Sequence, residues 1–332
     1  MYRKRMMNLV LEKRYFPLIK CLEQYRKDRT LVLWGGSGDL EKYLQGKYEL
    51  KWASYDPQKI SDCVMHMDQL CEKNEKYYII IPWLEKNDKR VNILKKYGYE
   101  PYKDFFFIKH NKIQIITKLG MHYKDEYGNE VISDSDGIEI VFNNSVYNAK
   151  VVVGKDIKGK VKIDIRGSCA NVVIEDKCQF KSQYIVGAAG SKIRIGENST
   201  FNLNCNFGAT EGWTINIGKD CMFSFDVIIQ AGDSHALFNG NTKERYNWTG
   251  KNNTSSVIIG DHVWIGLRAV ILGTSIIRKG SVVGACSLIK GDYKEYSAIA
   301  GNPGRVIKNN IAWSRDNASD EIIDCGMIYS DF

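Results

Sequence analysis

Aliphatic residues recur at every sixth position near the C-terminus, at Ile259, Ile265, Ile271, Ile277, Val283 and Ile289. Small or β-branched residues follow the first five by four positions, at Val263, Ala269, Ser275, Ser281 and Ser287. A period of six matches neither the 3.6-residue repeat of a helix nor the two-residue alternation of a hairpin sheet. The pattern predicts a solenoid of triangular coils, in which the aliphatic residue points inward and the small residue lies near a corner.

A coarser repeat extends this solenoid toward the N-terminus. Related segments begin 21, 21 and 22 residues apart, at Val153, Ile174, Ile195 and Ile217, and a fifth begins at Ile259. Stacked coils that share one core produce repeats of this length. Three cysteines fall at the small position of their coils, so we expect core packing and no chemistry from Cys178, Cys205 and Cys221.

The segment before the solenoid alternates short apolar runs with helical stretches. The pattern predicts strands at 31–34, 49–55, 77–81 and 105–108 and helices at 1–20, 40–44 and 89–97. This order favours a small parallel sheet of Rossmann-like type. We therefore expect an α/β domain over 1–118 and an all-β solenoid domain over 119–332, in which a hairpin signal at Tyr127-Gly128-Asn129 leads into the first coil.

Length and composition agree with a folded chain of two domains. The chain has 332 residues, of which 44% are hydrophobic and 26% are charged. Its longest apolar run has about eight residues, far below the roughly 20 that a membrane span needs. Nine cysteines without a CxxC pair, in a chain without a signal-peptide pattern, predict reduced thiols and a cytoplasmic location.

The net charge of +8 suits an anionic partner, such as a phosphorylated ligand or an acidic glycan. No zinc-finger spacing, RNP motif or basic zipper occurs, so we do not expect nucleic-acid binding. The densest basic stretch runs from Arg3 to Lys20 and leaves a peripheral membrane contact open.

The six-residue repeat units, or hexads, are interrupted once. After Ile217 the inward positions fall at Phe223 and Ile229, and the next falls at His235. A largely polar stretch, 237–256, then intervenes before the repeat resumes. A long loop inserted into a regular repeat is usually functional.

Two segments of this chain carry a more specific pattern: Val257-Ile258-Ile259-Gly260-Asp261-His262-Val263-Trp264-Ile265-Gly266 and Ala300-Gly301-Asn302-Pro303-Gly304-Arg305-Val306-Ile307-Lys308. Together they resemble the C-terminal coils of the galactoside, xenobiotic and capsular-polysaccharide acetyltransferases. The resemblance covers about residues 138–308. It implies a left-handed parallel β-helix of the hexapeptide-repeat acyltransferases, acetyl-coenzyme A as donor, and a homotrimer with shared active sites. No three histidines converge, so we expect no metal.

The resemblance also implies roles for the residues at the break. An Asp-x-His segment supplies the catalytic histidine in the resembling O-acetyltransferases, and here that residue is His235. Histidine can take the proton of a sugar hydroxyl as its oxygen attacks a thioester. Asp233 would orient the imidazole, or be only a turn residue. Trp264 would lie beside the acceptor, or be only a corner residue, and we expect His262 to be a solvated corner.

By the same resemblance, the pantetheine arm of coenzyme A lies along the backbone of the insertion-free coils. This implies contacts with Gly266, Gly284 and Ala285. Three basic residues would meet the phosphates, or be ordinary surface charge: Lys290, Arg305 and Lys308. Pro303 would face the adenine.

We therefore predict an acetyl-coenzyme A-dependent O-acetyltransferase that acts on a bacterial surface polysaccharide or its sugar precursor by direct transfer. One alternative is an N-acetyltransferase of a nucleotide-linked amino sugar. The Gly-rich turn 35–38 and Asp56 favour it, although Glu41 stands where a dinucleotide fingerprint has a small residue. The other alternative is a non-enzymatic trimeric scaffold with a ligand-binding N-terminal domain.

Overall fold

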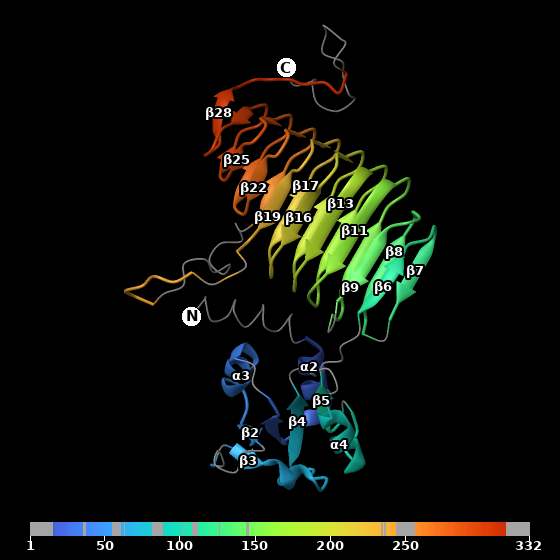
Figure 1. The fold of residues 1–332 in the computed structure, drawn as a ribbon, viewed down its shortest axis with the longest axis vertical. Coiled ribbons are helices and arrows are strands. Elements are labelled where there is room, and N and C mark those ends of the chain that lie inside the picture. The colour runs from blue at the N-terminus through green and yellow to red at the C-terminus, as the bar shows by residue number, and fades with distance from the viewer. Residues whose placement is uncertain are drawn as a thin grey trace. The chain divides into compact units, whose positions relative to one another are not determined.

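The structure is a computed structural model. It describes residues 16–35, 38–54, 61–62, 64–81, 89–101, 103–107, 112–125, 127–143, 146–233, 235, 237–243 and 256–316. The chain divides into two compact units between Lys112 and Ile113. Figure 1 shows the N-terminal unit in blue and teal and the other unit in green to red.

The N-terminal unit is built on a parallel sheet with the strand order β3-β2-β1-β4-β5. Its strands are β1 (Thr30–Leu33), β2 (Leu50–Ser54), β3 (Val64–His66), β4 (Tyr77–Ile81) and β5 (Phe105–Phe107). Its helical segments are α2 (Phe16–Cys21), the π-helical turn η1 (Leu22–Arg26), α3 (Gly38–Gln45), the 3-10 turn η3 (Met67–Leu70) and α4 (Arg90–Lys96). None of the described helices is long and apolar enough to span a membrane.

The predicted strands and the two later helices are confirmed to within a few residues. The almost uninterrupted apolar runs of β1 and β4 belong to central strands that are covered on both faces. The edge strand β3 was missed, because its three residues are too few to show a period. Gly36, Ser37, Asp56 and most of the predicted helix 1–20 lie outside the described residues.

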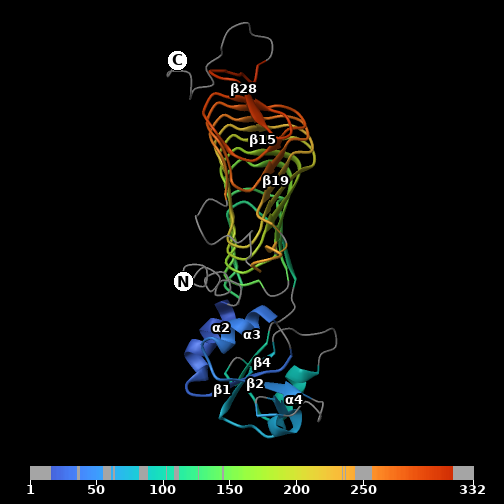
Figure 2. The same cartoon turned by 90° about the vertical axis from the view of Figure 1, so that its left-hand side faces the viewer.

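The second unit is a β-solenoid, as in a left-handed β-helix, with three stacks of parallel strands (Figures 1 and 2). The first stack is β8 (Glu130–Ser133), β10 (Lys150–Val153), β12 (Asn171–Ile174), β14 (Lys192–Ile195), β17 (Thr214–Ile217), β20 (Val257–Ile259), β23 (Ser275–Ile277) and β26 (Asp292–Tyr293). The second stack is β15 (Thr200–Phe201), β18 (Met222–Phe223), β21 (Trp264–Ile265), β24 (Val282–Val283) and β27 (Ala298–Ala300). The third stack is β9 (Glu139–Phe142), β16 (Cys205–Ala209), β19 (Ile228–Ala231), β22 (Val270–Leu272) and β25 (Leu288–Ile289). Two longer strands, β11 (Lys158–Ile165) and β13 (Gln179–Gly187), reach from the side of the second stack into the third.

Antiparallel strands close both ends of the solenoid. At the N-terminal end, β6 (Ile113–Ile116) pairs with β9, and β7 (Met121–Lys124) pairs with β8 in the hairpin that the sequence predicts. At the other end β28 (Arg305–Lys308) turns back along β27. Such pairing covers strand edges that would otherwise be open.

The core of the solenoid confirms the hexad pattern. All six inward aliphatic residues from Ile259 to Ile289 are at most 1% exposed, and so are the five small residues that follow them. Phe180, Phe201 and Phe223 stack in successive coils, with ring centroids 5.0 and 4.6 Å apart. The thiols of Cys178, Cys205 and Cys221 are buried among these coils, as expected for core residues.

Candidate active site

The solenoid breaks where β19 ends at Ala231. Gly232 has a φ of 92°, and a Cβ atom there would lie 1.9 Å from the Thr210 hydroxyl and 2.9 Å from the Trp213 ring. Only glycine therefore fits at the point where the chain leaves the coil. Asp233 and His235 follow directly, and both are exposed.

This placement confirms that the repeat breaks at His235. Ala231 is fully buried, whereas His235, which the hexads number as an inward position, lies outside the core. The described start of the loop is more apolar than we expected, because Leu237 and Phe238 are both more than half exposed. The assignment of Asp233 to orient His235 stays a prediction, and residues 234, 236 and 244–255 lie outside the described part.

Trp264 lies on β21 of the second stack, whereas His235 follows β19 of the third stack. The Trp264 side chain is 39% exposed, and its ring centroid lies 6.0 Å from that of Trp313 at an interplanar angle of 46°. Trp313 belongs to the C-terminal segment 311–316, which the sequence patterns did not single out. The two predicted site residues thus lie on different stacks of one chain.

The expectation that His262 is a solvated corner is wrong. His262 adopts the left-handed conformation of a corner residue, with a φ of 52°, but it is fully buried. Trp313 covers it, with ring centroids 4.0 Å apart and planes 11° apart, and the Trp313 indole donates to the His262 carbonyl oxygen at 3.0 Å. The covering residue comes 51 positions later in the chain, so no local pattern could reveal it.

Arg315 extends the same cluster. Its Nε donates to Asp220 Oδ1 at 2.8 Å, and its Nη2 donates to the carbonyl oxygens of Asp220 and Cys221. Burial on its own raises the pKa of Asp220, but the hydrogen bond from His262 and the charge of Arg315 outweigh burial and hold that pKa below its ordinary value. The segment 311–316 is therefore fastened to the coils that carry Trp264.

Three of the predicted donor-binding residues come together at one corner. Gly266 and Gly284 follow β21 and β24 in adjacent coils, and their amides donate to the carbonyl oxygens of Val283 and Ile299 at 2.8 Å. A Cβ atom on Gly266 would lie 2.7 Å from the Val283 carbonyl oxygen. Ala285 is exposed at the same corner.

The other predicted donor contacts lie near the C-terminal end of the solenoid. Pro303, Arg305 and Lys308 are exposed on β28 and the turn before it, and that turn is held to β25 by a bond of 2.8 Å from the Gly304 amide to the Leu288 carbonyl oxygen. Lys290 is exposed directly after β25, at a different corner from Gly266. Within the described ranges, no three His, Cys, Asp or Glu side chains gather as a metal site would require.

Comparisons with known proteins place this architecture in a family. No family model matches the chain. The chain is 32% identical over 177 residues to the polysialic acid O-acetyltransferase of Neisseria meningitidis, a match that covers 52% of this chain and 76% of that protein. It is also 32% identical over 140 residues to the polysialic acid O-acetyltransferase of Escherichia coli O1:K1 / APEC, where the match covers 42% of this chain and 44% of the relative's length.

A solved structure agrees with these relatives. The crystal structure of the polySia specific acetyltransferase NeuO matches with a TM-score of 0.51 and 30% identity, over 58% of this chain and 85% of that chain. The chain belongs to the hexapeptide-repeat acetyltransferases. The predictions of this family and of an acyltransferase are confirmed.

Proposed function

We propose that the protein is an acetyl-coenzyme A-dependent O-acetyltransferase that acts on a bacterial surface polysaccharide or its sugar precursor. The observation that carries the proposal is the break at Gly232, which leaves Asp233 and His235 at an exposed corner of a solenoid of this family. Polysialic acid, named in the descriptions of two relatives, is an acidic polymer, and the net charge of +8 suits such an acceptor.

The reaction is direct transfer from thioester to hydroxyl. His235 takes the proton of the acceptor hydroxyl while the oxygen forms a bond to the acetyl carbonyl carbon. The carbon–sulfur bond then breaks, and the coenzyme A thiolate leaves and receives the proton from the imidazolium. Asp233 holds the imidazole in the productive orientation and stabilises its charged form. Trp264 offers an apolar ring face and an indole N–H to the acceptor sugar.

The corner after the second stack suits the donor. The amides of Gly266 and Gly284 are used between coils, but those of Leu267 and Ala285 donate to no acceptor within the described residues. Unpaired amides at adjacent coils can hydrogen-bond the amide groups of a pantetheine arm. Lys290, Pro303, Arg305 and Lys308 would serve the nucleotide end, as the family resemblance implies.

A homotrimer is part of this proposal. Leu203, Phe225 and Leu267 occupy equivalent corner positions in three successive coils, and they are 44%, 43% and 39% exposed. An exposed apolar ridge along the solenoid supports association with further copies of the chain. Phe225→Asp would then dissociate the assembly, which light scattering after gel filtration would detect.

A Rossmann-like N-terminal domain and a cytoplasmic location are also part of the proposal. The strand order β3-β2-β1-β4-β5, with every neighbouring pair parallel, supports a Rossmann-like N-terminal domain. The seven described cysteines form no disulfide, which supports a reducing compartment such as the cytoplasm.

The test is direct. The full chain is incubated with acetyl-coenzyme A and a panel of acidic and neutral polysaccharides, and the sugars are examined by mass spectrometry. One added acetyl group on one acceptor, removable by mild alkali as an ester, is the expected product. Acetylation of amino groups alone, or no coenzyme A release with any acceptor, would refute the proposal.

A further inference from the structure

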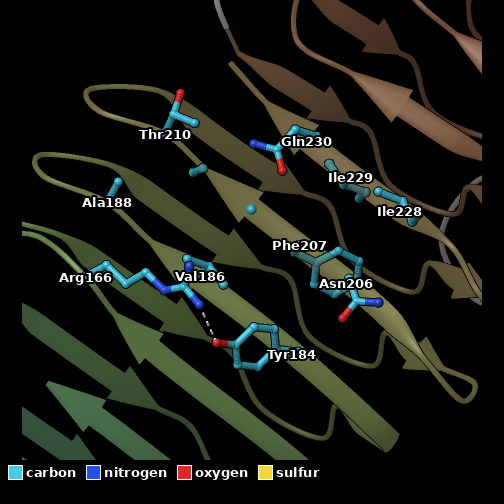
Figure 3. A pocket seen from close by; sticks show the side chains of 12 residues that line it. Arg166, Tyr184, Val186, Ala188, Asn206, Phe207, Thr210, Ile228, Ile229 and Gln230 are labelled. Carbon is cyan, nitrogen blue, oxygen red and sulfur yellow. Dashed lines mark hydrogen bonds between the residues drawn. The ribbon is translucent and has the colours of Figure 1, made fainter. Parts of the chain in front are cut away.

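A shallow trough of about 290 Å³ crosses the outer surface of the third stack, over β13, β16 and β19, with Arg166, directly after β11, at one end (Figure 3). Strand register arranges the outward-facing residues in and around the trough in three rows that run across the coils. The middle row is Asp164, Val186, Gly208 and Gln230. The row on one side is Lys162, Tyr184, Asn206 and Ile228, and the row along the corner is Arg166, Ala188, Thr210 and Gly232.

Gly208 is the one residue of the middle row without a side chain. A Cβ atom on Gly208 would lie 2.6 Å from Gln230 Oε1, so glycine leaves the room that the Gln230 amide occupies. The taller side chains of Tyr184 and Asn206 stand beside this floor (Figure 3). Its volume is close to the lower end of the range for small-molecule sites, about 300 Å³, and suits a single sugar ring.

One end of the trough presents a fixed guanidinium group. Arg166 Nε donates to Asp164 Oδ2 at 2.9 Å, and Arg166 Nη2 donates to the Tyr184 hydroxyl at 2.8 Å, which itself donates to Asp164 Oδ2 at 2.5 Å. Asn143 donates to the other oxygen of Asp164. These contacts hold Arg166 and Tyr184 in place before any ligand arrives.

The arrangement presents Arg166, and not Asp164, to a ligand. The Arg166 side chain is 55% exposed, whereas that of Asp164 is 9% exposed, and Nη1 of Arg166 donates to no acceptor in the described part of the chain. An oriented guanidinium edge is well suited to a carboxylate. Asn206 and Gln230 add amide groups that can hydrogen-bond sugar hydroxyls, and the Tyr184 ring adds an apolar face.

The other end of the trough leads to the break in the solenoid. Gln230 lies on β19, and Asp233 follows it by three residues, just beyond the end of that strand. Neighbouring strands lie about 4.8 Å apart, so the three steps from β11 to β19 place Arg166 about 14 Å from the corner at Gly232. A single sugar at His235 cannot span this distance, but an extended polymer can.

We propose that this trough is a remote acceptor subsite, which binds a carboxylated sugar unit of the polysaccharide while another unit lies at His235. This inference rests on the proposed function. It assigns to the trough the selection of a polymeric acceptor over a single sugar. Arg166 holds the carboxylate, and Tyr184, Asn206 and Gln230 contact the ring.

The test compares Arg166→Ala and Asn206→Ala with Arg194→Ala. Arg194 lies on β14 of the first stack, is 41% exposed and is paired with Glu175, so it is a matched arginine outside the trough. Asn206→Ala leaves all the hydrogen-bond partners of Asp164 in place, so this variant tests the trough without disturbing the packing around that buried carboxylate. With acetyl-coenzyme A and polysialic acid, both trough variants should raise the acceptor KM about tenfold, as loss of a charge-assisted or neutral bond to a ligand predicts.

Three further measurements test the subsite: the KM for acetyl-coenzyme A, the rate with a single-sugar acceptor, and the binding of a carboxyl-reduced polymer. The trough variants should leave the KM for acetyl-coenzyme A and the rate with a single-sugar acceptor unchanged, and Arg194→Ala should change nothing. Polysialic acid with its carboxylates reduced to alcohols should bind the wild-type protein as weakly as native polymer binds Arg166→Ala.

If the trough variants match Arg194→Ala while the wild-type protein acetylates the polymer, the subsite is refuted and the proposed function stands. In the opposite case the subsite exists but the proposed function fails, and calorimetry with the polymer in the absence of acetyl-coenzyme A detects it. Polymer binding that is lost in Arg166→Ala but kept in Arg194→Ala supports the subsite, even if no acetyl transfer is found and the proposed function fails.

Discussion

Asp220 and His262 come from adjacent coils, and Asp220 Oδ2 lies 2.6 Å from His262 Nδ1. The other ring nitrogen of His262 lies 3.1 Å from the carbonyl oxygen of Trp313. An ionised carboxylate and a carbonyl can only accept hydrogen bonds, so both contacts are satisfied when the imidazole carries two protons. The imidazole is thus buried between Asp220 and the C-terminal segment, under the ring of Trp313.

Replacing His262 with Ala should destabilise the solenoid. The change removes the stacking surface of Trp313 and one of the two side chains that hydrogen-bond to the Asp220 carboxylate, which is only 12% exposed. Breaking a buried pair in this way costs about 3–5 kcal/mol of the free energy of unfolding. Urea denaturation followed by tryptophan fluorescence measures the loss. His122→Ala, which removes a largely exposed histidine paired with Glu130, is the matched control and should change stability far less.

The same cluster predicts how stability depends on pH. The pKa of Asp220 is lower in the folded chain than its unfolded value of about 3.9. A carboxyl group of this kind stabilises the fold fully above its unfolded pKa, and the contribution disappears as pH falls through the folded pKa. The difference in unfolding free energy between wild type and Asp220→Asn should be largest near pH 6 and shrink below about pH 4. A difference that grows on acidification would contradict this account.

Thiol reactivity should separate the core cysteines from the surface. Burial raises the pKa of Cys178 and Cys221 to about 12 and that of Cys205 to about 11, whereas Cys286 is exposed. Iodoacetamide at pH 8 should label Cys286 and leave the other three unlabelled until the chain is unfolded, because the thiolate is the nucleophile. Peptide mass spectrometry reads the sites. Early labelling of Cys221 would show that the coil around it opens.

Trp264→Ala should weaken acceptor binding more than donor binding. Its exposed indole would lose contact with the sugar, so we expect the acceptor KM to rise about tenfold and the KM for acetyl-coenzyme A to stay within twofold. Ile258→Ala provides the control, since Ile258 is 38% exposed on the first stack and Trp264 is 39% exposed on the second. Equal effects of the two substitutions would remove Trp264 from the acceptor site.

The sequence predicts the solenoid well because the fold is built from a local repeat. Each inward aliphatic residue and each small corner residue is determined by neighbours six or four positions away. The break at His235 is visible for the same reason, since it is a departure from a regular pattern. The parallel sheet of the N-terminal unit is also predictable, because β1 and β4 are nearly continuous apolar runs.

Contacts between distant segments were not predictable. His262 is buried only because Trp313 returns from the C-terminal segment, and Arg166 is held by a partner on β13, 18 residues further along the chain. The trough carries no sequence motif, since its rows combine residues from four coils. Asp164 and Arg166 are two residues apart, and Tyr184 lies one coil later. That these three side chains meet can be recognised only when the register of β11 and β13 is known.

The central claim is that the imidazole of His235 removes the acceptor proton. Acetyl transfer to polysialic acid is measured for the wild-type protein, for His235→Ala and for His122→Ala, an exposed histidine far from the break in sequence, with circular dichroism to show that each variant is folded. The account predicts a loss of kcat of about 10²–10⁴-fold in His235→Ala and no loss in His122→Ala. A folded His235→Ala protein that turns over at the wild-type rate would contradict it.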